Sequence, residues 1–230
     1  MYEIADLFDL TQTEHAALFE GCQYPWEVLK KLGDYCRSRP NQGQHHKALG
    51  TVYIGENVQI GEGTILEPGV TILGPAIIGR NCVLRHNAYL RENCVIGDNC
   101  TVGNACEVKN SLFFNKASAP HFNYVGDCVL GYHAHLGAGA ALSNLKLDGG
   151  NVWVEGDNGV PLDTGLRKFG SLLGDDTDIG CNAVLNPGSI IGRNSMVYPN
   201  LSWRGYLPAN MIAKHKARPE VVVRRPRGVV

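Results

Sequence analysis

A six-residue spacing of aliphatic side chains constrains the fold of this chain more than any other feature. Every sixth residue from position 54 to position 108 is isoleucine, leucine or valine, and the ten members of this column are Ile54, Ile60, Leu66, Ile72, Ile78, Leu84, Leu90, Ile96, Val102 and Val108. Such residues make up roughly a quarter of a chain, so chance produces this run on the order of once in a million sequences. The column therefore indicates an internal structural repeat.

A second column, three residues after the first, consists largely of asparagine and glycine. Both residue types tolerate positive φ, so this column predicts a corner in each repeat. Small side chains follow one position later and are expected to pack inside the corners; they include Cys82, Cys94, Cys100, Cys106 and Cys128. A short strand and a corner, repeated every six residues, are typical of a parallel β-helix in which three repeats close one coil. We predict an all-β fold, a parallel β-helix with a short N-terminal helical segment.

The spacing continues beyond residue 108, after four additional residues and again after a longer interruption near 148–170. The later members are Tyr124, Leu130, Leu136 and Leu142, followed by Leu173, Ile179, Leu185, Ile191 and Val197. Together these repeats predict roughly six coils at the usual strand spacing. Because a regular prism offers no cleft, the interruptions at 114–127 and 143–170 are the expected places for chemistry.

Three regions differ in character: an N-terminal helical extension (1–50), the β-helix (51–206) and a basic C-terminal tail (207–230). Two stretches of the extension are expected to be helical, one beginning at Thr13 and one at Pro25, where proline suits a first helical turn. We expect these helices to pack on or near the open end of the first coil, whose strand edge is otherwise unpaired.

Composition argues against several classes of protein. The chain has 21 basic and 22 acidic side chains and a net charge of −1, which argues against a nucleic-acid or polybasic membrane binder. Its N-terminus is acidic, unlike a signal peptide, and no apolar run approaches the roughly 20 residues of a membrane span. We therefore expect a cytoplasmic protein with reduced cysteines. The Cys-x2-Cys spacing of zinc sites is absent from the sequence, so the corner cysteines are interpreted as small buried side chains.

A more specific motif lies in the segment 121–144. The string His121-Phe122-Asn123-Tyr124-Val125-Gly126-Asp127 is followed by Leu136-Gly137-Ala138-Gly139 and by Ser143-Asn144. These strings resemble the acetyltransferase domain of the bifunctional bacterial N-acetylglucosamine-1-phosphate uridyltransferases. They are also similar to archaeal sugar-1-phosphate nucleotidyltransferase/acetyltransferases. The resemblance covers residues 54–202 and implies a left-handed β-helix of the hexapeptide-repeat acyltransferases.

The resemblance implies roles for three residues of this segment. His121 matches the family's general base, which takes a proton from the sugar amine, and a neutral imidazole suits that task. Asn144 matches an asparagine near the acetyl-transfer site, where an amide orients the amine or donates to the developing oxyanion. Tyr124 matches a tyrosine that contacts the sugar phosphate, although its place in the aliphatic column equally permits a core position.

Arg91 and Lys109 match two basic residues that hold the sugar phosphate or nucleotide. Their spacing supports this role independently. Each follows an aliphatic residue by one position, and they lie 18 residues apart, so they are expected to point outward from neighbouring coils about 5 Å apart. Like charges this close are unfavourable unless an anion such as phosphate bridges them. Lys168 matches a further lysine of the family, across a longer loop.

Acetyl-CoA is the acyl donor that the resemblance implies, without any metal. We assign its contacts to Ala138, Cys181 and Pro199 on the later coils, with the basic tail from Lys214 available to its phosphates. Cys181 stands where the family has a serine near the thioester. His135 replaces a family asparagine and is retained as a substrate-binding candidate.

The sequence thus predicts an acetyl-CoA-dependent N-acetyltransferase that acts on an amino sugar phosphate. The resemblance implies a homotrimer with its sites between neighbouring prisms. About 50 residues precede the repeats and contain no glycine-rich phosphate loop, so nucleotidyl transfer is not expected. Two alternatives are a non-catalytic scaffold and a zinc protein like the γ-class carbonic anhydrases. His121, His133 and His135 are the candidate ligands for zinc, but two histidines two residues apart on a corner do not favour one tetrahedral ion.

Overall fold

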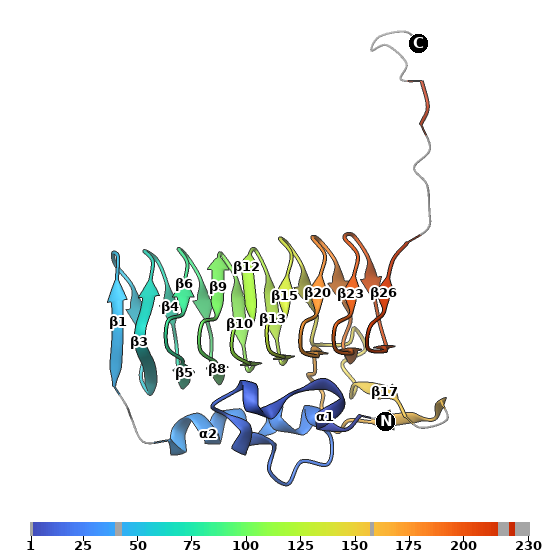
Figure 1. Cartoon of the computed structure of the whole chain (residues 1–230), viewed down its shortest axis with the longest axis horizontal. Coiled ribbons are helices and arrows are strands. Elements are labelled where there is room, and N and C mark those ends of the chain that lie inside the picture. Colours follow the sequence, from blue (N-terminus) through green and yellow to red (C-terminus); the bar gives the residue numbers. More distant parts are fainter. Residues whose placement is uncertain (1, 40–42, 157–158, 216–220, 224–230) are drawn as a thin grey trace.

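The computed structural model describes residues 2–39, 43–156, 159–215 and 221–223. Most of the chain forms a prism of short strands stacked along one axis, and the N-terminal segment lies along one flank of this prism (Figure 1). Apart from one antiparallel hairpin, the paired strands are parallel. The left-handed parallel β-helix is confirmed. One face contains eight strands, one per coil, so the prism has more coils than the roughly six predicted.

The prism has three faces. The eight-stranded face consists of β2 (Tyr53–Ile54), β4 (Thr71–Ile72), β7 (Tyr89–Leu90), β10 (Glu107–Lys109), β13 (Tyr124–Gly126), β16 (Ala141–Leu142), β21 (Val184–Leu185) and β24 (Ser202–Trp203). The second, named the covered face, consists of β5 (Ala76–Ile78), β8 (Cys94–Ile96), β11 (Leu112–Phe113), β14 (Val129–Leu130), β19 (Ser171–Leu173), β22 (Ser189–Ile191) and β25 (Tyr206–Leu207).

The third, named the histidine face because it holds His121 and His135, consists of β6 (Val83–Leu84), β9 (Thr101–Asn104), β12 (Ser118–His121), β15 (His135–Leu136), β20 (Asp178–Ile179), β23 (Met196–Val197) and β26 (Ile212–Ala213). The long strand β3 (Val58–Leu66) turns a corner and joins the covered and histidine faces. Strand β1 (Gln44–Ala48) pairs with β3 and covers the edge of the first coil. Parallel pairing therefore runs from Gln44 to Ala213, beyond both expected limits of 51–206.

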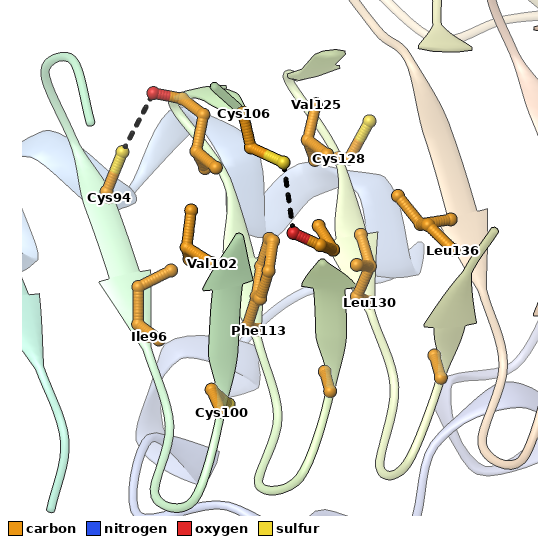
Figure 2. Packing of buried hydrophobic residues seen from close by; sticks show 14 of the residues in the cluster. Cys94, Ile96, Cys100, Val102, Cys106, Phe113, Val125, Cys128, Leu130 and Leu136 are labelled. Carbon is orange, nitrogen blue, oxygen red and sulfur yellow. Dashed lines mark hydrogen bonds between the residues drawn. The ribbon is translucent and has the colours of Figure 1, made fainter. Parts of the chain in front are cut away.

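The aliphatic column fills the prism as predicted. From Ile60 to Val108 its members are at most 2% exposed. Corner residues such as Asn57, Asn81 and Asn99 have positive φ, between 54° and 59°. Figure 2 shows the column side chains between the stacked strands, with the thiols of Cys94 and Cys106 directed at carbonyl oxygens. All eight cysteines are free thiols, and those of the corner column are buried.

The register after Val108 differs from the prediction. Val108 pairs with Val125 in the next coil, so Val125 and not Tyr124 occupies the core column. The coils contain 17 residues here because the corners after Val108 and after Val125 are each one residue shorter than the corners before Val108. Residues 114–127 are therefore regular coil, and interpreting them as an interruption was wrong. The interruption at 143–170 is real and contains the antiparallel hairpin of β17 (Trp153–Glu155) and β18 (Pro161–Asp163).

The N-terminal layer (residues 2–39) packs along the covered face, and our prediction that it packs at the open end was wrong. It contains α1 (Ile4–Leu7), 3-10 helices Leu10–Gln12, Ala16–Phe19 and Pro25–Lys30, and α2 (Leu32–Ser38). The outward side chains of the covered face are apolar in successive coils, as in Val95, Leu112 and Val129, and each of these three is fully buried. Covering them removes apolar surface from water, which explains the position of the layer. No helix in the described ranges is long and apolar enough to cross a membrane.

Candidate functional site

His121 lies at the end of β12, at the corner where the histidine face meets the eight-stranded face. The carbonyl oxygens of His121, Ala138 and Cys181 each accept a backbone N–H from the next coil, at 2.9 Å. These bonds and the strand register place four predicted site residues one above another, a set named the edge column: His121, Ala138, Cys181 and Pro199. The His121 imidazole is exposed and makes no hydrogen bond or ion pair with the described part of the chain.

Asn123 fixes the backbone at this corner and was missed by the sequence reasoning. Its side chain is buried; its Oδ1 accepts the backbone N–H of His121 at 3.0 Å, and its Nδ2 donates to the carbonyl oxygens of Gly137 and Ala140. These bonds hold the tight turn at Phe122, where φ is 53°. The asparagine inside the His-x2-Tyr string was the available signal.

A second group of side chains, the Asn144 corner, lies where the eight-stranded face meets the covered face; it comprises Asn144, Asp127, Tyr124 and Lys109. The Asn144 amide nitrogen donates to a carboxylate oxygen of Asp127, and its Oδ1 accepts from the Tyr124 hydroxyl at 3.4 Å. A carboxylate only accepts hydrogen bonds, so the amide nitrogen must face Asp127. Partial burial raises the pKa of Tyr124, so the phenol remains a donor at neutral pH. The half-buried Tyr124 side chain therefore lies at the Asn144 corner and not in the prism core.

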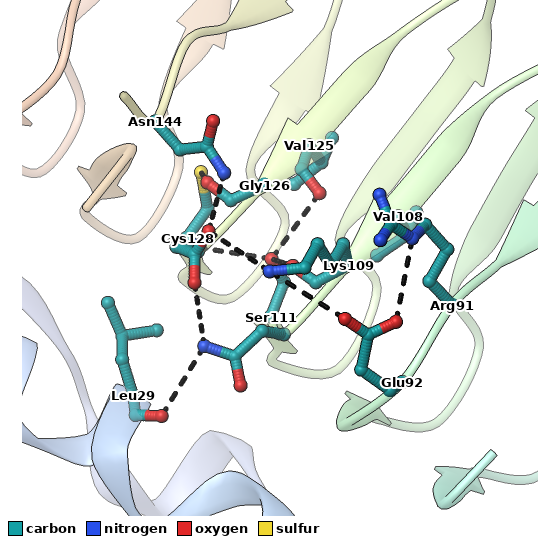
Figure 3. A network of polar contacts seen from close by, with 12 residues as sticks. Leu29, Arg91, Glu92, Val108, Lys109, Ser111, Val125, Gly126, Cys128 and Asn144 are labelled. Atoms are coloured by element: carbon teal, nitrogen blue, oxygen red, sulfur yellow. Dashed lines mark hydrogen bonds and ion pairs between the residues drawn. The ribbon is translucent and has the colours of Figure 1, made fainter. Parts of the chain in front are cut away.

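Arg91 and Lys109 point outward from neighbouring coils, as predicted from their spacing. Carboxylates of the protein itself lie close to both cations. The Arg91 guanidinium lies 3.2 Å from Glu107, and the Lys109 ammonium lies 3.8 Å from Asp127. Glu92 lies between the two cations, 3.5 Å from Arg91 and 3.7 Å from Lys109 (Figure 3). Three carboxylates thus offset the two cations, so the cation pair does not by itself require a bound phosphate.

Lys168 is an exposed cation beside the Asn144 corner. An antiparallel bridge joins Leu145 to Lys168, and the backbone N–H of Phe169 donates to the carbonyl oxygen of Asn144 at 2.9 Å. Within the described ranges the Lys168 ammonium forms no ion pair. The long insertion therefore returns to the prism with Lys168 next to the segment of Asn144.

His135 lies in the middle of the histidine face, away from the Asn144 corner. Its Nδ1 is 2.8 Å from the Ser118 hydroxyl, and it lines a depression of about 410 Å³ together with His133, whose Nδ1 is 3.0 Å from Asp176. His121 is not among the residues lining this depression. In the part of the chain that the structure describes, no group of three or more histidine, cysteine or acidic side chains could hold a metal ion. Within one chain, the three histidines considered above as zinc ligands are thus not gathered at one place.

Apart from His135, the predicted residues thus form two groups at opposite edges of the eight-stranded face. One is the edge column, and the other is the Asn144 corner with Arg91 and Lys168 beside it. Of the basic tail, Lys214 follows the last strand and is exposed, whereas Lys216 and Arg218 lie outside the described residues.

Comparison with known proteins shows which families this chain resembles. The family described as the GMPPB C-terminal domain matches residues 72–160. The bifunctional protein GlmU of Methanococcus maripaludis is 34% identical over 177 residues, which are 77% of this chain and 42% of that protein. The chain resembles the bifunctional GlmU proteins. The resemblance that the motifs predicted is confirmed, over less than half the length of this relative.

Two further proteins are similar. A bifunctional sugar-1-phosphate nucleotidylyltransferase/acetyltransferase of Sulfurisphaera tokodaii is 34% identical over 91 residues, 40% of this chain and 22% of that protein. Among solved structures, a UDP-N-acetylglucosamine acyltransferase of Arabidopsis has a TM-score of 0.46 and 17% identity, and the alignment covers 77% of this chain and 69% of that one.

Proposed function

We propose that this chain transfers the acetyl group of acetyl-CoA to the amino group of an amino sugar phosphate. One observation carries this proposal: His121 shares the edge column with Ala138, Cys181 and Pro199. The expected base and the expected contacts to acetyl-CoA were assigned from separate parts of the sequence, and they lie along one corner. A donor extended along this corner would bring its thioester to the imidazole.

In the proposed reaction the sugar amine attacks the thioester carbonyl. A carbon–nitrogen bond forms, the carbon–sulfur bond breaks, and the proton leaving the amine passes to His121 and then to the CoA sulfur. An exposed imidazole that has no hydrogen-bond partner in the described ranges is free to accept that proton. Cys181 needs no role as a nucleophile, because acetyl passes directly from donor to amine.

The Asn144 corner is the proposed place for the sugar phosphate. Tyr124 and Asn144 supply neutral polar groups, and Lys168 supplies a positive charge that is not paired with a carboxylate among the described residues. Arg91 is about a third exposed, so it is available to the phosphate at the expense of its contact with Glu107. We therefore assign the phosphate to Lys168 and Arg91, with Lys109 held behind them by Asp127 and Glu92.

We further propose a homotrimer, because the two groups of site residues lie at opposite edges of one face. Three prisms packed around a common axis bring an edge of one protomer close to a face of the next. A site formed between two protomers in this way would contain the edge column of one and the Asn144 corner of the other. Sedimentation velocity on the purified chain measures the oligomeric state, and a monomer at micromolar concentration would contradict this assembly.

The function is tested by measuring thiol release from acetyl-CoA with a panel of amino sugars. The panel contains glucosamine-1-phosphate, galactosamine-1-phosphate and a nucleotide-linked amino sugar, with unphosphorylated glucosamine as the control. We expect release with at least one phosphorylated amino sugar, and a lower kcat/KM for glucosamine because Lys168 and Arg91 then lack their partner. No release with any member would refute the proposed function.

A further inference from the structure

Asp127 is the most enclosed acidic group at the Asn144 corner, although the proposed reaction gives it no role. The residue is 4% exposed. One carboxylate oxygen accepts from the Asn144 amide, and the other accepts from Asn110 Nδ2 at 2.9 Å. The Lys109 ammonium lies 3.8 Å away. A buried carboxylate is stable only with such partners, so these contacts hold one another in place.

The Asp127 backbone is held as firmly as its side chain. Its N–H donates to the carbonyl oxygen of Lys109 at 2.9 Å, and its carbonyl oxygen accepts from Gly170, the residue at which the insertion rejoins the prism, at 2.8 Å. Its φ of 52° is a conformation that aspartate tolerates. The carboxylate is therefore held in one position, and it orients the side-chain amides of Asn144 and Asn110 that donate to it.

The hydrogen bonds at Asp127 also set the direction of the Asn144 amide. Since the amide nitrogen faces the carboxylate, Oδ1 faces the Tyr124 hydroxyl and the outer surface. Without the carboxylate, either orientation of the amide would satisfy the remaining contacts. The same carboxylate reaches the N-terminal layer, because Asn110 Nδ2 also donates to the carbonyl oxygen of Leu29 at 3.4 Å (Figure 3).

We propose that Asp127 is a positioning residue of the acetyl-transfer site, which orients the Asn144 amide and joins it through Asn110 to the N-terminal layer. This inference rests on the proposed function. The N-terminal layer then helps to hold the Asn144 amide in place, although the layer covers a different face of the prism. Asp127 touches no reacting atom in this scheme and acts through Asn144.

Asp127→Asn is the test, with Asp175→Asn as a matched control. Asp127→Asn keeps the shape of the side chain and replaces one accepting oxygen by an NH2 group. This donor then faces the donating NH2 group of Asn144 or of Asn110, so one hydrogen bond is lost. Asp175 is a comparably buried aspartate that accepts the backbone N–H of Asp9 and of Tyr132, so it also joins the layer to the prism, but it contacts no candidate site residue. A merely structural role predicts the same result for both variants.

We expect Asp127→Asn to lower kcat by about 10- to 100-fold, the order seen for small misplacements of reacting groups, with the KM for acetyl-CoA changed less than about twofold. Asp175→Asn should lower the unfolding temperature and keep kcat. The exchange variant Asp127→Asn/Asn110→Asp restores a donor opposite an acceptor between residues 110 and 127 and between residues 127 and 144, although it loses the bond from residue 110 to Leu29. It should recover part of the lost kcat. Equal losses of kcat in the two single variants, or wild-type kcat in Asp127→Asn, would overturn the proposal.

A second measurement does not depend on activity. The Asn144 side-chain amide resonance, assigned by its disappearance in Asn144→Ala, should exchange slowly with solvent in the wild type and faster in Asp127→Asn, but not in Asp175→Asn. An amide that exchanges equally slowly in Asp127→Asn would overturn the positioning role. A wild type without thiol release would instead refute the proposed function, and the exchange rates would still decide whether Asp127 orients the amide.

Discussion

Phe114→Ala tests whether the N-terminal layer is part of the folded core. Phe114 follows the core residue Phe113 in the chain and lies on the covered side of the prism, yet it is fully buried. Its ring lies 5.1 Å from that of Phe8 and 5.9 Å from that of Phe19, both in the layer. Truncating a buried phenylalanine costs about 3–5 kcal/mol of unfolding free energy. For a chain of this length that loss lowers the unfolding temperature by on the order of 10 °C.

Urea unfolding followed by circular dichroism measures this loss, and Phe122→Ala is the control. Phe122 is 62% exposed, so its truncation should cost no more than about 0.5 kcal/mol. A double-mutant cycle between Phe8 and Phe114 should give a coupling of about 0.5–1.5 kcal/mol for the ring contact. If Phe114→Ala cost as little as Phe122→Ala, the layer would not be packed on this flank and the reasoning from burial would be refuted.

Three further predictions concern catalysis, thiols and pH. His121→Ala should lower turnover by about 10²–10⁴-fold and leave acetyl-CoA affinity intact. Arg91→Ala should mainly raise the KM for the sugar phosphate, and the effect of Asn144→Ala should fall between the two. Steady-state kinetics measure these effects, and near-wild-type turnover of His121→Ala would contradict the base assignment. In the native protein a thiol reagent should modify the exposed Cys181 and spare the cysteines of the corner column, because these are buried and the reagent cannot reach them. Burial also raises the pKa of Cys94, and mass spectrometry of the labelled protein checks the prediction. Burial lowers the pKa of His15 to about 4, so the unfolded chain binds its proton first and stability should fall by about 3 kcal/mol as pH drops from 6.5 to 4; a urea series should show this slope, and His15→Gln should lack it.

The fold was largely predictable from the sequence because each coil contacts mainly its neighbours. The six-residue column and the asparagine corners are local features, and their repetition defines the prism without reference to distant segments. The covered face was also encoded, since Ile77, Val95, Leu112 and Val129 are apolar where side chains point outward. That signal was available and was not used. Which segment covers these residues was not readable, because an apolar surface accepts any segment of suitable shape.

The register at the site and the partners of its charges were decided by tertiary structure. A corner shortened by one residue moved Tyr124 out of the core and Val125 into it, and both side chains are apolar enough for either place. Spacing placed Arg91 above Lys109 because strand stacking is regular, but the three carboxylates that offset them depend on side-chain directions at the corners. The sequence by itself determined which residues stack along the prism axis. Only the tertiary structure decided which of their side chains contact one another, because contacts around a corner depend on how many residues that corner contains.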